Sequence, residues 1–156
     1  MARVNVGLNP NLLSDQHLVA ESVEITMITG NLRLNEYKLK TTIPTKFPMG
    51  KGHINFFKDK LVYLKRRLDE VNKEMIRRGF TPGTKIDLTE FPVEFHGDWT
   101  PTMEDSIILR ERVADRLLTR ANGKSATRLH RYNKRYLGWY SKCLGNKIIN
   151  SELFFV

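Results

Sequence analysis

The feature that most constrains the fold is a run of apolar residues whose spacing alternates between three and four. On a helix with 3.6 residues per turn, this spacing places all of them on one face. Charged residues occupy most of the positions between them. The pattern predicts one amphipathic helix that ends at Gly79, because a glycine often terminates a helix and Pro82 prevents its continuation. The apolar positions are Ile54, Phe57, Leu61, Leu64, Leu68, Val71 and Met75.

A second helix is predicted from about Leu13 to Ile28. Ser14 is expected as its N-cap and Asp15 lies in the first turn, where a negative charge favours the helix dipole. Gly30 is expected to end it. Its apolar residues form a moderate stripe that comprises Leu18, Ala20, Ile25 and Ile28.

A third helix is predicted from about Pro101 to Thr119. We expect Thr100 as its N-cap, because proline is common at the first helical position. Glu104 and Asp105 suit the positive end of the helix dipole. The apolar residues of this segment are Ile107, Leu109, Val113, Leu117 and Leu118.

The two connections, at about 31–52 and 80–100, contain proline, glycine and threonine without strong alternation, which predicts loops and short turns. With 156 residues, the chain has the length of one domain. The predicted fold class is therefore all-α. We expect a compact single domain with a three-helix core at 1–120, and a basic, aromatic C-terminal extension of the same domain at 121–156.

The positive charge is concentrated near the C-terminus. Lys and Arg total 26 against 17 acidic residues, and eight of the basic residues lie between positions 120 and 150, where there is no acidic residue. Such a field attracts polyanions, and aromatic rings within it can stack on bases. The segment fits a nucleic-acid contact, and it also fits a solvated tail whose rings pack on the core. Its aromatic residues are Tyr132, Tyr136, Trp139 and Tyr140.

Several classes of protein are excluded or disfavoured. No apolar run approaches the roughly 18 residues that a membrane span needs, and the N-terminus does not resemble a signal peptide. The single cysteine, Cys143, rules out an internal disulfide framework and a zinc site built from cysteines. We expect a cytoplasmic monomer with no membrane contact and no protein partner.

His17, Glu21 and Glu24 recur at i, i+4 and i+7, so one face of the second predicted helix carries an imidazole and two carboxylates. Three interpretations are open. The face is a solvated polar surface, or it forms part of a metal site that needs further ligands. Alternatively, it holds a catalytic carboxylate beside a histidine. Spacing alone does not choose among them.

Two other motifs are compatible with phosphate binding. Gly50-Lys51-Gly52 precedes a predicted helix, but it lacks the remainder of a nucleotide-binding loop, so a structural turn is the favoured interpretation. Arg112, Arg116 and Arg120 recur every four residues and lead into the basic segment. This stripe is either a solvated face or a phosphate-tracking surface, and its continuity with the basic segment favours the latter.

Several motif blocks in order resemble the phage pyrimidine-dimer DNA glycosylases of the endonuclease V type. The resemblance covers roughly residues 2–120. Near the N-terminus, it rests on Arg3-x-Asn5 and on Asp15-Gln16-His17-Leu18-x-Ala20-Glu21-x-x-Glu24. Farther along, it rests on Gly50-x-Gly52-His53-x-x-Phe56-Phe57-x-Asp59-Lys60-Leu61, on Arg78-Gly79-Phe80 and on Phe95-x-Gly97-Asp98-x-x-Pro101.

The resemblance implies an α-helical enzyme that removes cyclobutane pyrimidine dimers from double-stranded DNA and then nicks the strand as an abasic-site lyase, in the cytoplasm of an infected host cell if the chain is phage-encoded. It implies that the nucleophile is the α-amine of Ala2, exposed when Met1 is removed, and that Glu24 is the essential carboxylate. It implies no metal and no cofactor. The DNA contacts it implies are Arg3, Gln16, His17, Arg112, Arg116, Arg120, Trp139 and Tyr140.

The sequence also departs from this family's pattern. Val23 and Met27 stand where the family carries arginines, and each lost phosphate contact weakens DNA binding. Two alternatives therefore remain. One is a glycosylase of the same fold for another damaged or modified base, and the other is a non-catalytic DNA- or RNA-binding protein.

Overall fold

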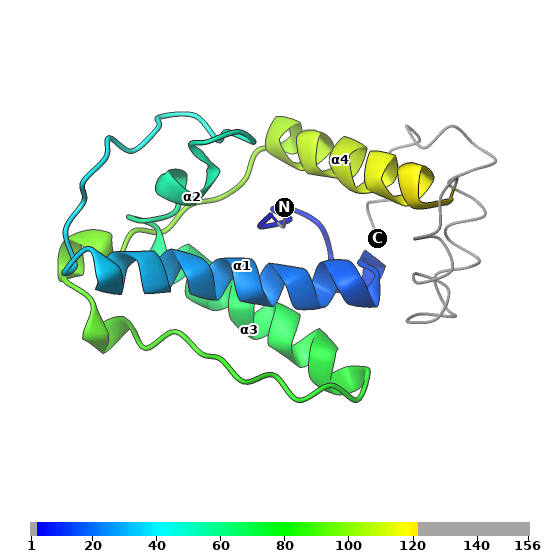
Figure 1. Cartoon of the computed structure of the whole chain (residues 1–156), viewed down its shortest axis with the longest axis horizontal. Helices are drawn as coiled ribbons and strands as arrows, with labels where there is room; N and C mark the ends of the chain where they lie inside the picture. Colours follow the sequence, from blue (N-terminus) through cyan, green and yellow to red (C-terminus); the bar gives the residue numbers. More distant parts are fainter. Residues whose placement is uncertain (1–2, 122–156) are drawn as a thin grey trace. The chain divides into compact units, whose positions relative to one another are not determined.

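The computed structural model describes the backbone of residues 3–121 and the side chains of residues 3–113 (Figure 1). Within these residues the chain is helical and has no β-strand, which confirms the predicted all-α class. The helices are α1 (Asp15–Leu34), α2 (His53–Phe56), α3 (Leu61–Arg77) and α4 (Met103–Ala121), with 3-10 helices η1 (Pro10–Leu12), η2 (Leu88–Glu90) and η3 (Val93–Phe95).

The chain divides into two compact units. The first comprises Met1–Val4 and Val19–Thr100, and the second comprises Asn5–Leu18 and Pro101–Val156. The predicted C-terminal extension at 121–156 falls almost entirely outside the described residues. The division of the chain at residue 120 therefore stays a prediction.

In the first unit, α1 and α3 contribute the apolar core. The predicted face of α3 is buried, since Leu61, Leu64, Leu68 and Val71 have no exposed area and Met75 is 6% exposed. Ile25, Ile28 and Leu32 of α1 are fully buried as well. The periodicity of the sequence therefore identified the core faces of both helices.

The predicted continuous helix from residue 54 to residue 75 is instead two helices, because a distant segment interrupts it. Gly97 donates its N–H to the Asp59 carbonyl at 2.9 Å, and the Val62 N–H donates to the Gly97 carbonyl at 3.1 Å. A Cβ at residue 97 would lie 2.2 Å from that Asp59 oxygen, so only glycine permits the approach. Lys60 Nζ donates to the carbonyl of Phe56, the last residue of α2, at 2.8 Å. These bonds replace the helical hydrogen bonds that the sequence predicted.

The predicted end of this segment at Gly79 is confirmed. Gly79 has φ of 90°, a conformation that glycine adopts without strain. Phe80 N–H donates to the Met75 carbonyl and Gly79 N–H donates to the Ile76 carbonyl, both at 2.9 Å. This is the Schellman arrangement, and it satisfies two carbonyls of the last turn.

The predicted end of α1 at Gly30 is wrong, because the helix continues to Leu34. A glycine within a helix costs only about 1 kcal/mol relative to alanine, and the extra turn buries Leu32 completely. The helix stops where Glu36 and Tyr37 adopt positive φ and Tyr37 N–H donates to the Leu32 carbonyl at 2.8 Å.

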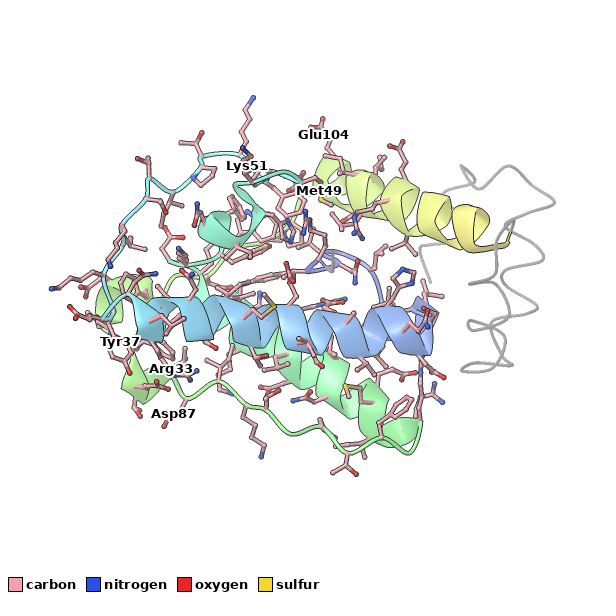
Figure 2. All side chains as sticks on the ribbon, viewed as in Figure 1. Arg33, Tyr37, Met49, Lys51, Asp87 and Glu104 are labelled. Atoms are coloured by element: carbon pink, nitrogen blue, oxygen red, sulfur yellow. The ribbon has the colours of Figure 1, made fainter. Side chains whose placement is uncertain are left out.

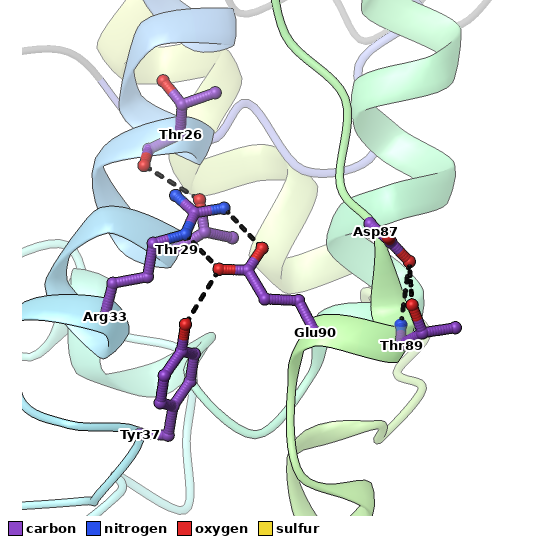
Figure 3. Close-up of polar contacts among 7 residues, drawn as sticks. All are labelled: Thr26, Thr29, Arg33, Tyr37, Asp87, Thr89 and Glu90. Carbon is purple, nitrogen blue, oxygen red and sulfur yellow. Dashed lines mark hydrogen bonds and ion pairs between the residues drawn. The ribbon is translucent and has the colours of Figure 1, made fainter.

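The C-terminal turn of α1 is joined to η2 by a polar cluster (Figure 3). The Arg33 guanidinium donates to both carboxylate oxygens of Glu90, and the Tyr37 hydroxyl donates to Glu90 Oε1 at 3.1 Å. The Arg33 hydrogen bond lowers the pKa of the Glu90 carboxyl and exceeds the opposing effect of burial. The hydrogen bond that the Tyr37 hydroxyl donates to Glu90 raises the pKa of Tyr37, and burial raises it further.

The predicted connections are confirmed as mainly irregular segments, although the first is shortened by the extension of α1. They contribute to an aromatic cluster in which neighbouring ring centroids lie between 5.0 and 6.0 Å apart. Most of these pairs are edge-to-face, the geometry that the ring quadrupoles favour. The rings belong to Phe47, His53, Phe56, Phe57, Tyr63 and Trp99.

In the second unit, the predicted N-cap of α1 is confirmed, since Ser14 Oγ accepts a hydrogen bond from His17 N at 3.1 Å. The N-cap predicted for α4 was wrong by two residues. Thr102 Oγ1 accepts from Asp105 N at 3.2 Å, and Asp105 Oδ2 accepts from Thr102 N at 2.8 Å. This reciprocal capping box satisfies two backbone N–H groups and therefore starts the helix after Thr102, not after Thr100.

Close packing in the second unit also involves Gly7, which has φ of 72°. A Cβ at this position would lie 1.8 Å from Ser106 Oγ, so a larger residue would displace the first turns of α4. Leu109 and Val113 of α4 are buried as their apolar character suggests, whereas Ile107 is 40% exposed.

Within residues 3–121, none of the helices combines the length and the apolar character needed to cross a bilayer.

Candidate active site

Glu24 lies in the middle of α1 and is almost completely buried, with 2% of its surface exposed. Its Oε1 lies 3.7 Å from Nη1 of Arg3, in the N-terminal segment of the same unit. Arg3 is also held by its Nε, which donates to the Met49 carbonyl at 3.1 Å. A buried carboxylate needs a nearby positive charge, and Arg3 supplies one. The pair therefore joins the beginning of the chain to α1.

The next residue along the chain is fixed by a histidine. The Val4 N–H donates to His53 Nε2 at 3.0 Å, and His53 Nδ1 donates to the Pro48 carbonyl at 2.9 Å. This pattern assigns the neutral ring with its proton on Nδ1. The side chains of Val4 and His53 are buried. Two successive residues, Arg3 and Val4, are thus held by one segment, which spans residues 48–53.

Glu21, one turn before Glu24, has a structural partner. Arg67 of α3 binds both of its carboxylate oxygens, with Nε to Oε1 at 2.6 Å and Nη2 to Oε2 at 3.0 Å. Burial alone would lower the pKa of the guanidinium. The Glu21 charge and hydrogen bonds outweigh that effect and raise it. This bidentate geometry places the two side chains in direct contact within the core.

The three polar residues on α1 thus have different surroundings. His17 Nδ1 lies 2.9 Å from Ser14 Oγ, Glu21 binds Arg67 and Glu24 pairs with Arg3. His17 belongs to the second unit and the two glutamates to the first. Among the residues that the structure describes, no group of three histidine, cysteine or acidic residues is arranged to hold a metal ion.

For the remaining predicted site residues, the structure describes the side chain of some, only the backbone of others, and neither for the rest. Gln16 and His17 are half-buried in the first turn of α1, and Arg112 is half-buried on α4. Arg116 and Arg120 lie on the α4 backbone, but their side chains are outside the described ones. Ala2, Trp139 and Tyr140 lie outside the described residues. The roles expected for all of these residues stay predictions.

The residues that replace the expected arginines are exposed. Val23 is 52% exposed and Met27 is 54% exposed, and they lie one helical turn apart on α1. Glu24, which lies between them in the sequence, is only 2% exposed. An apolar stripe therefore occupies the part of α1 where positive charges were expected.

Gly50-Lys51-Gly52 forms a turn immediately before α2, as expected. Figure 2 shows the Lys51 side chain pointing outward, and this residue is exposed. A Cβ on Gly52 would lie 3.0 Å from Pro44 Cγ and 3.1 Å from Pro48 Cγ, so the glycine lets the segment fold tightly. The favoured interpretation of this motif, a structural turn, is confirmed.

No role was predicted for two residues that build this site, Met49 and His53. His53 belongs to the Gly50-x-Gly52-His53 motif. The motif draws attention to His53, but it does not identify Val4 as the residue that His53 binds. Pro48 and Met49 contribute through their backbone carbonyls, which every residue has, so the sequence does not indicate these contacts.

The described residues define a class of helical proteins in which an N-terminal arginine, Arg3, is held beside the buried carboxylate of Glu24. The family model of the pyrimidine dimer DNA glycosylases matches residues 1–88, which is more than half of the chain, and the chain belongs to this family. The match contains Arg3, Glu24 and His53, and it confirms the resemblance stated from the motifs. It identifies a DNA repair glycosylase family whose substrate is DNA.

Proposed function

We propose that this chain excises cyclobutane pyrimidine dimers from double-stranded DNA and then cleaves the strand at the resulting abasic site. The nucleophile is the α-amine of Ala2, exposed after removal of Met1, and Glu24 is the essential carboxylate. The observation that carries the proposal is the ion pair between Arg3 and Glu24. It anchors the residue that follows Ala2 beside a buried acid, and family membership supplies the substrate class.

An α-amine suits this reaction better than a lysine does. A larger fraction of an α-amine is unprotonated at neutral pH, and only the unprotonated nitrogen is nucleophilic. The nitrogen attacks C1′ of the damaged nucleotide, and the bond between C1′ and the base breaks with its electron pair leaving on the base. The nitrogen loses a proton, the bond between C1′ and O4′ breaks with O4′ taking up a proton, and a protonated imine results.

Glu24 has two tasks in this scheme. Its negative charge stabilises the cationic sugar that forms as the base departs, and stabilisation of developing charge is strongest in a site that excludes water. In the second step a proton leaves C2′ of the imine, and the bond between C3′ and its phosphate oxygen breaks. Glu24 manages proton transfer in this elimination. Its burial and its position next to Arg3 support both tasks.

Borohydride trapping tests the proposal. The full chain is incubated with duplex DNA that carries one site-specific thymine dimer, and borohydride reduces the imine to a stable secondary amine. Mass analysis of the N-terminal peptide then locates the adduct. We expect the adduct on Ala2, with Met1 absent, and the same yield in EDTA. Tight DNA binding without an adduct, with Met1 intact, would favour a non-catalytic binding protein.

A second candidate is a glycosylase that uses the same chemistry on a different damaged or modified base. The exposed apolar residues Val23 and Met27 favour it, because they stand where the family carries arginines and so remove positive charge from the exposed face of α1. Turnover on duplexes with a dimer, an abasic site or a modified base separates the two candidates. Strong preference for the dimer would reject this one.

A further inference from the structure

We propose that His53 is a positioning residue that fixes the N-terminal amine for attack, by holding the backbone of Val4. This inference rests on the proposed function, and it assigns a role to a residue that does not itself contact the reacting atoms. It concerns the hydrogen bond from the Val4 N–H to His53 Nε2, 3.0 Å long and buried.

The histidine is held rigidly on both of its nitrogens. While Nε2 accepts from Val4, Nδ1 donates to the Pro48 carbonyl at 2.9 Å. The ring also makes edge-to-face contacts with Phe47 and Phe57, at centroid distances of 5.4 and 5.2 Å. Only 1% of the residue is exposed. Because rotation of the ring would break both hydrogen bonds and disturb the packing, Nε2 is a fixed acceptor.

The hold on Val4 extends to Ala2 through covalent geometry. A chain spans at most about 3.6 Å per residue, so fixing the backbone of one residue restricts the volume open to the amine two residues before it. Arg3, between them, is restrained by its bonds to the Met49 carbonyl and its ion pair with Glu24. A chain terminus is ordinarily poorly ordered unless it is tied down. Here two adjacent residues are tied to residues 48–53.

This arrangement matters for the reaction because an amine held near its target reacts far faster than a free one. Restricting the reacting groups to a productive geometry supplies a large part of many enzymatic rate enhancements. His53 is buried and presents almost no surface to DNA, so its loss should slow formation of the imine without weakening DNA binding. A merely structural role would instead lower stability and affinity together.

Two variants of His53 separate these roles. In His53→Gln, the amide oxygen reaches the position of Nε2 and accepts from Val4. In His53→Asn, the shorter side chain reaches only the position of Nδ1, so it keeps a donor for the Pro48 carbonyl and loses the acceptor. Both variants place a neutral amide at the same buried position, so each serves as a control for the loss of stability that the other causes.

The experiment measures single-turnover borohydride trapping on dimer-containing duplex, together with DNA affinity, for the full-length wild-type chain and both variants. We expect trapping by His53→Asn to slow at least tenfold with its Kd unchanged within twofold. Trapping by His53→Gln should stay within threefold of wild type. Wild-type rates in His53→Asn, or equal slowing in both variants, would overturn the inference.

A second pair of measurements keeps the test decisive if either variant fails to fold. Replacing Val4 by its α-hydroxy analogue removes the N–H donor and leaves His53 intact, and it should slow trapping as His53→Asn does. Hydrogen exchange of the Val4 amide measures its hydrogen bond to His53 directly and does not depend on enzymatic activity. Protection of this amide in wild type supports the contact, and rapid exchange overturns it. Absence of any wild-type adduct would instead sink the proposed function.

Discussion

Arg3 Nη1 lies 3.7 Å from Glu24 Oε1, and this separation is longer than a direct hydrogen bond. The guanidinium is oriented from its other side by the Met49 carbonyl, which accepts from Nε. Glu24 on α1 and Arg3 near the N-terminus are therefore neighbours through an ion pair that is longer than a hydrogen bond.

Glu24→Gln should abolish imine formation and leave DNA affinity nearly intact. The amide keeps the shape of the side chain but loses the negative charge and the ability to take a proton, and such groups contribute about 10²- to 10⁴-fold to rate. Trapping rates and fluorescence anisotropy on the same duplex measure the two effects. Glu36→Gln, at an exposed position just after α1, is the matched control. Full activity in Glu24→Gln would disprove the assigned role.

Restoring positive charge on α1 should strengthen DNA binding. Val23 and Met27 are both about half exposed, so Val23→Arg and Met27→Arg have room for the longer side chain. Each new phosphate contact should steepen the salt dependence of log K by about 0.9. Titrations at several salt concentrations measure this slope. Val23→Gln and Met27→Gln control for loss of the apolar surface, and an unchanged slope in the arginine variants would show that this face does not meet DNA.

The buried pair of Glu21 and Arg67 should be costly to break and tolerant of joint replacement. Glu21→Gln removes the buried carboxylate from Arg67, and Arg67→Met removes the guanidinium from the buried Glu21; breaking a buried pair in this way costs about 3–5 kcal/mol. Replacing both residues by apolar ones, as in Glu21→Leu with Arg67→Met, should recover most of that loss. Urea unfolding of the two single variants and the double variant measures the coupling. Single variants that each lose less than about 1 kcal/mol would contradict a structural role.

The contact between Arg33 and Glu90 should make stability fall on the acid side. Because the Arg33 hydrogen bond lowers the pKa of Glu90 in the folded chain, the unfolded chain binds that proton more readily. The contribution is present above the ordinary glutamate pKa and is lost as pH falls through the lowered value. Arg33 is 44% exposed, so solvent screening limits the effect to about 1 kcal/mol or less.

Thermal melts between neutral pH and about pH 3 test this contribution. Glu90→Gln should have a lower Tm at neutral pH than wild type and a smaller further decrease in acid. Glu94→Gln, which removes an exposed carboxylate from η3, should follow the wild-type curve. Parallel curves for wild type and Glu90→Gln would show that the contact does not contribute in solution.

Two glycines should respond to alanine in opposite directions. Gly97→Ala places a Cβ 2.2 Å from the Asp59 carbonyl, so the contact that separates α2 from α3 must shift, at a cost of about 1–3 kcal/mol. Gly30→Ala meets no atom within 4 Å, and alanine favours the helix by about 0.5–1 kcal/mol. Urea unfolding of both variants measures the difference. A Gly97→Ala chain as stable as wild type would contradict the close approach.

Several parts of the fold and the site could be predicted from the residues themselves. The apolar face of α3, the Ser14 cap and the Gly79 stop each depend on positions within about four residues of one another. Spacing placed His17, Glu21 and Glu24 on one helix, and only the family resemblance of the motif blocks singled out Glu24 among them. The family assignment also follows from these blocks, and the match to residues 1–88 confirms it.

Other features were missed because their partners are distant in the sequence. Arg67 binds Glu21 across 46 residues, and Val4 binds His53 across 49. The break before α3 depends on Gly97, whose contacts with Asp59 and Val62 replace bonds that a continuous helix would have made. The periodicity of the sequence does not indicate that a distant N–H group, that of Gly97, will bind the Asp59 carbonyl in place of a helical N–H.

The sequence by itself determined the all-helical class, the core face of α3 and the family. Amphipathic spacing and capping are interactions between near neighbours on one helix, so they are readable without knowing the fold. Tertiary structure alone decided that Glu21 supports the core through Arg67, that Glu24 lies beside Arg3 and that His53 holds Val4. Each of these depends on which buried charge or backbone N–H meets which partner once the chain has folded, and burial makes satisfying such groups energetically necessary.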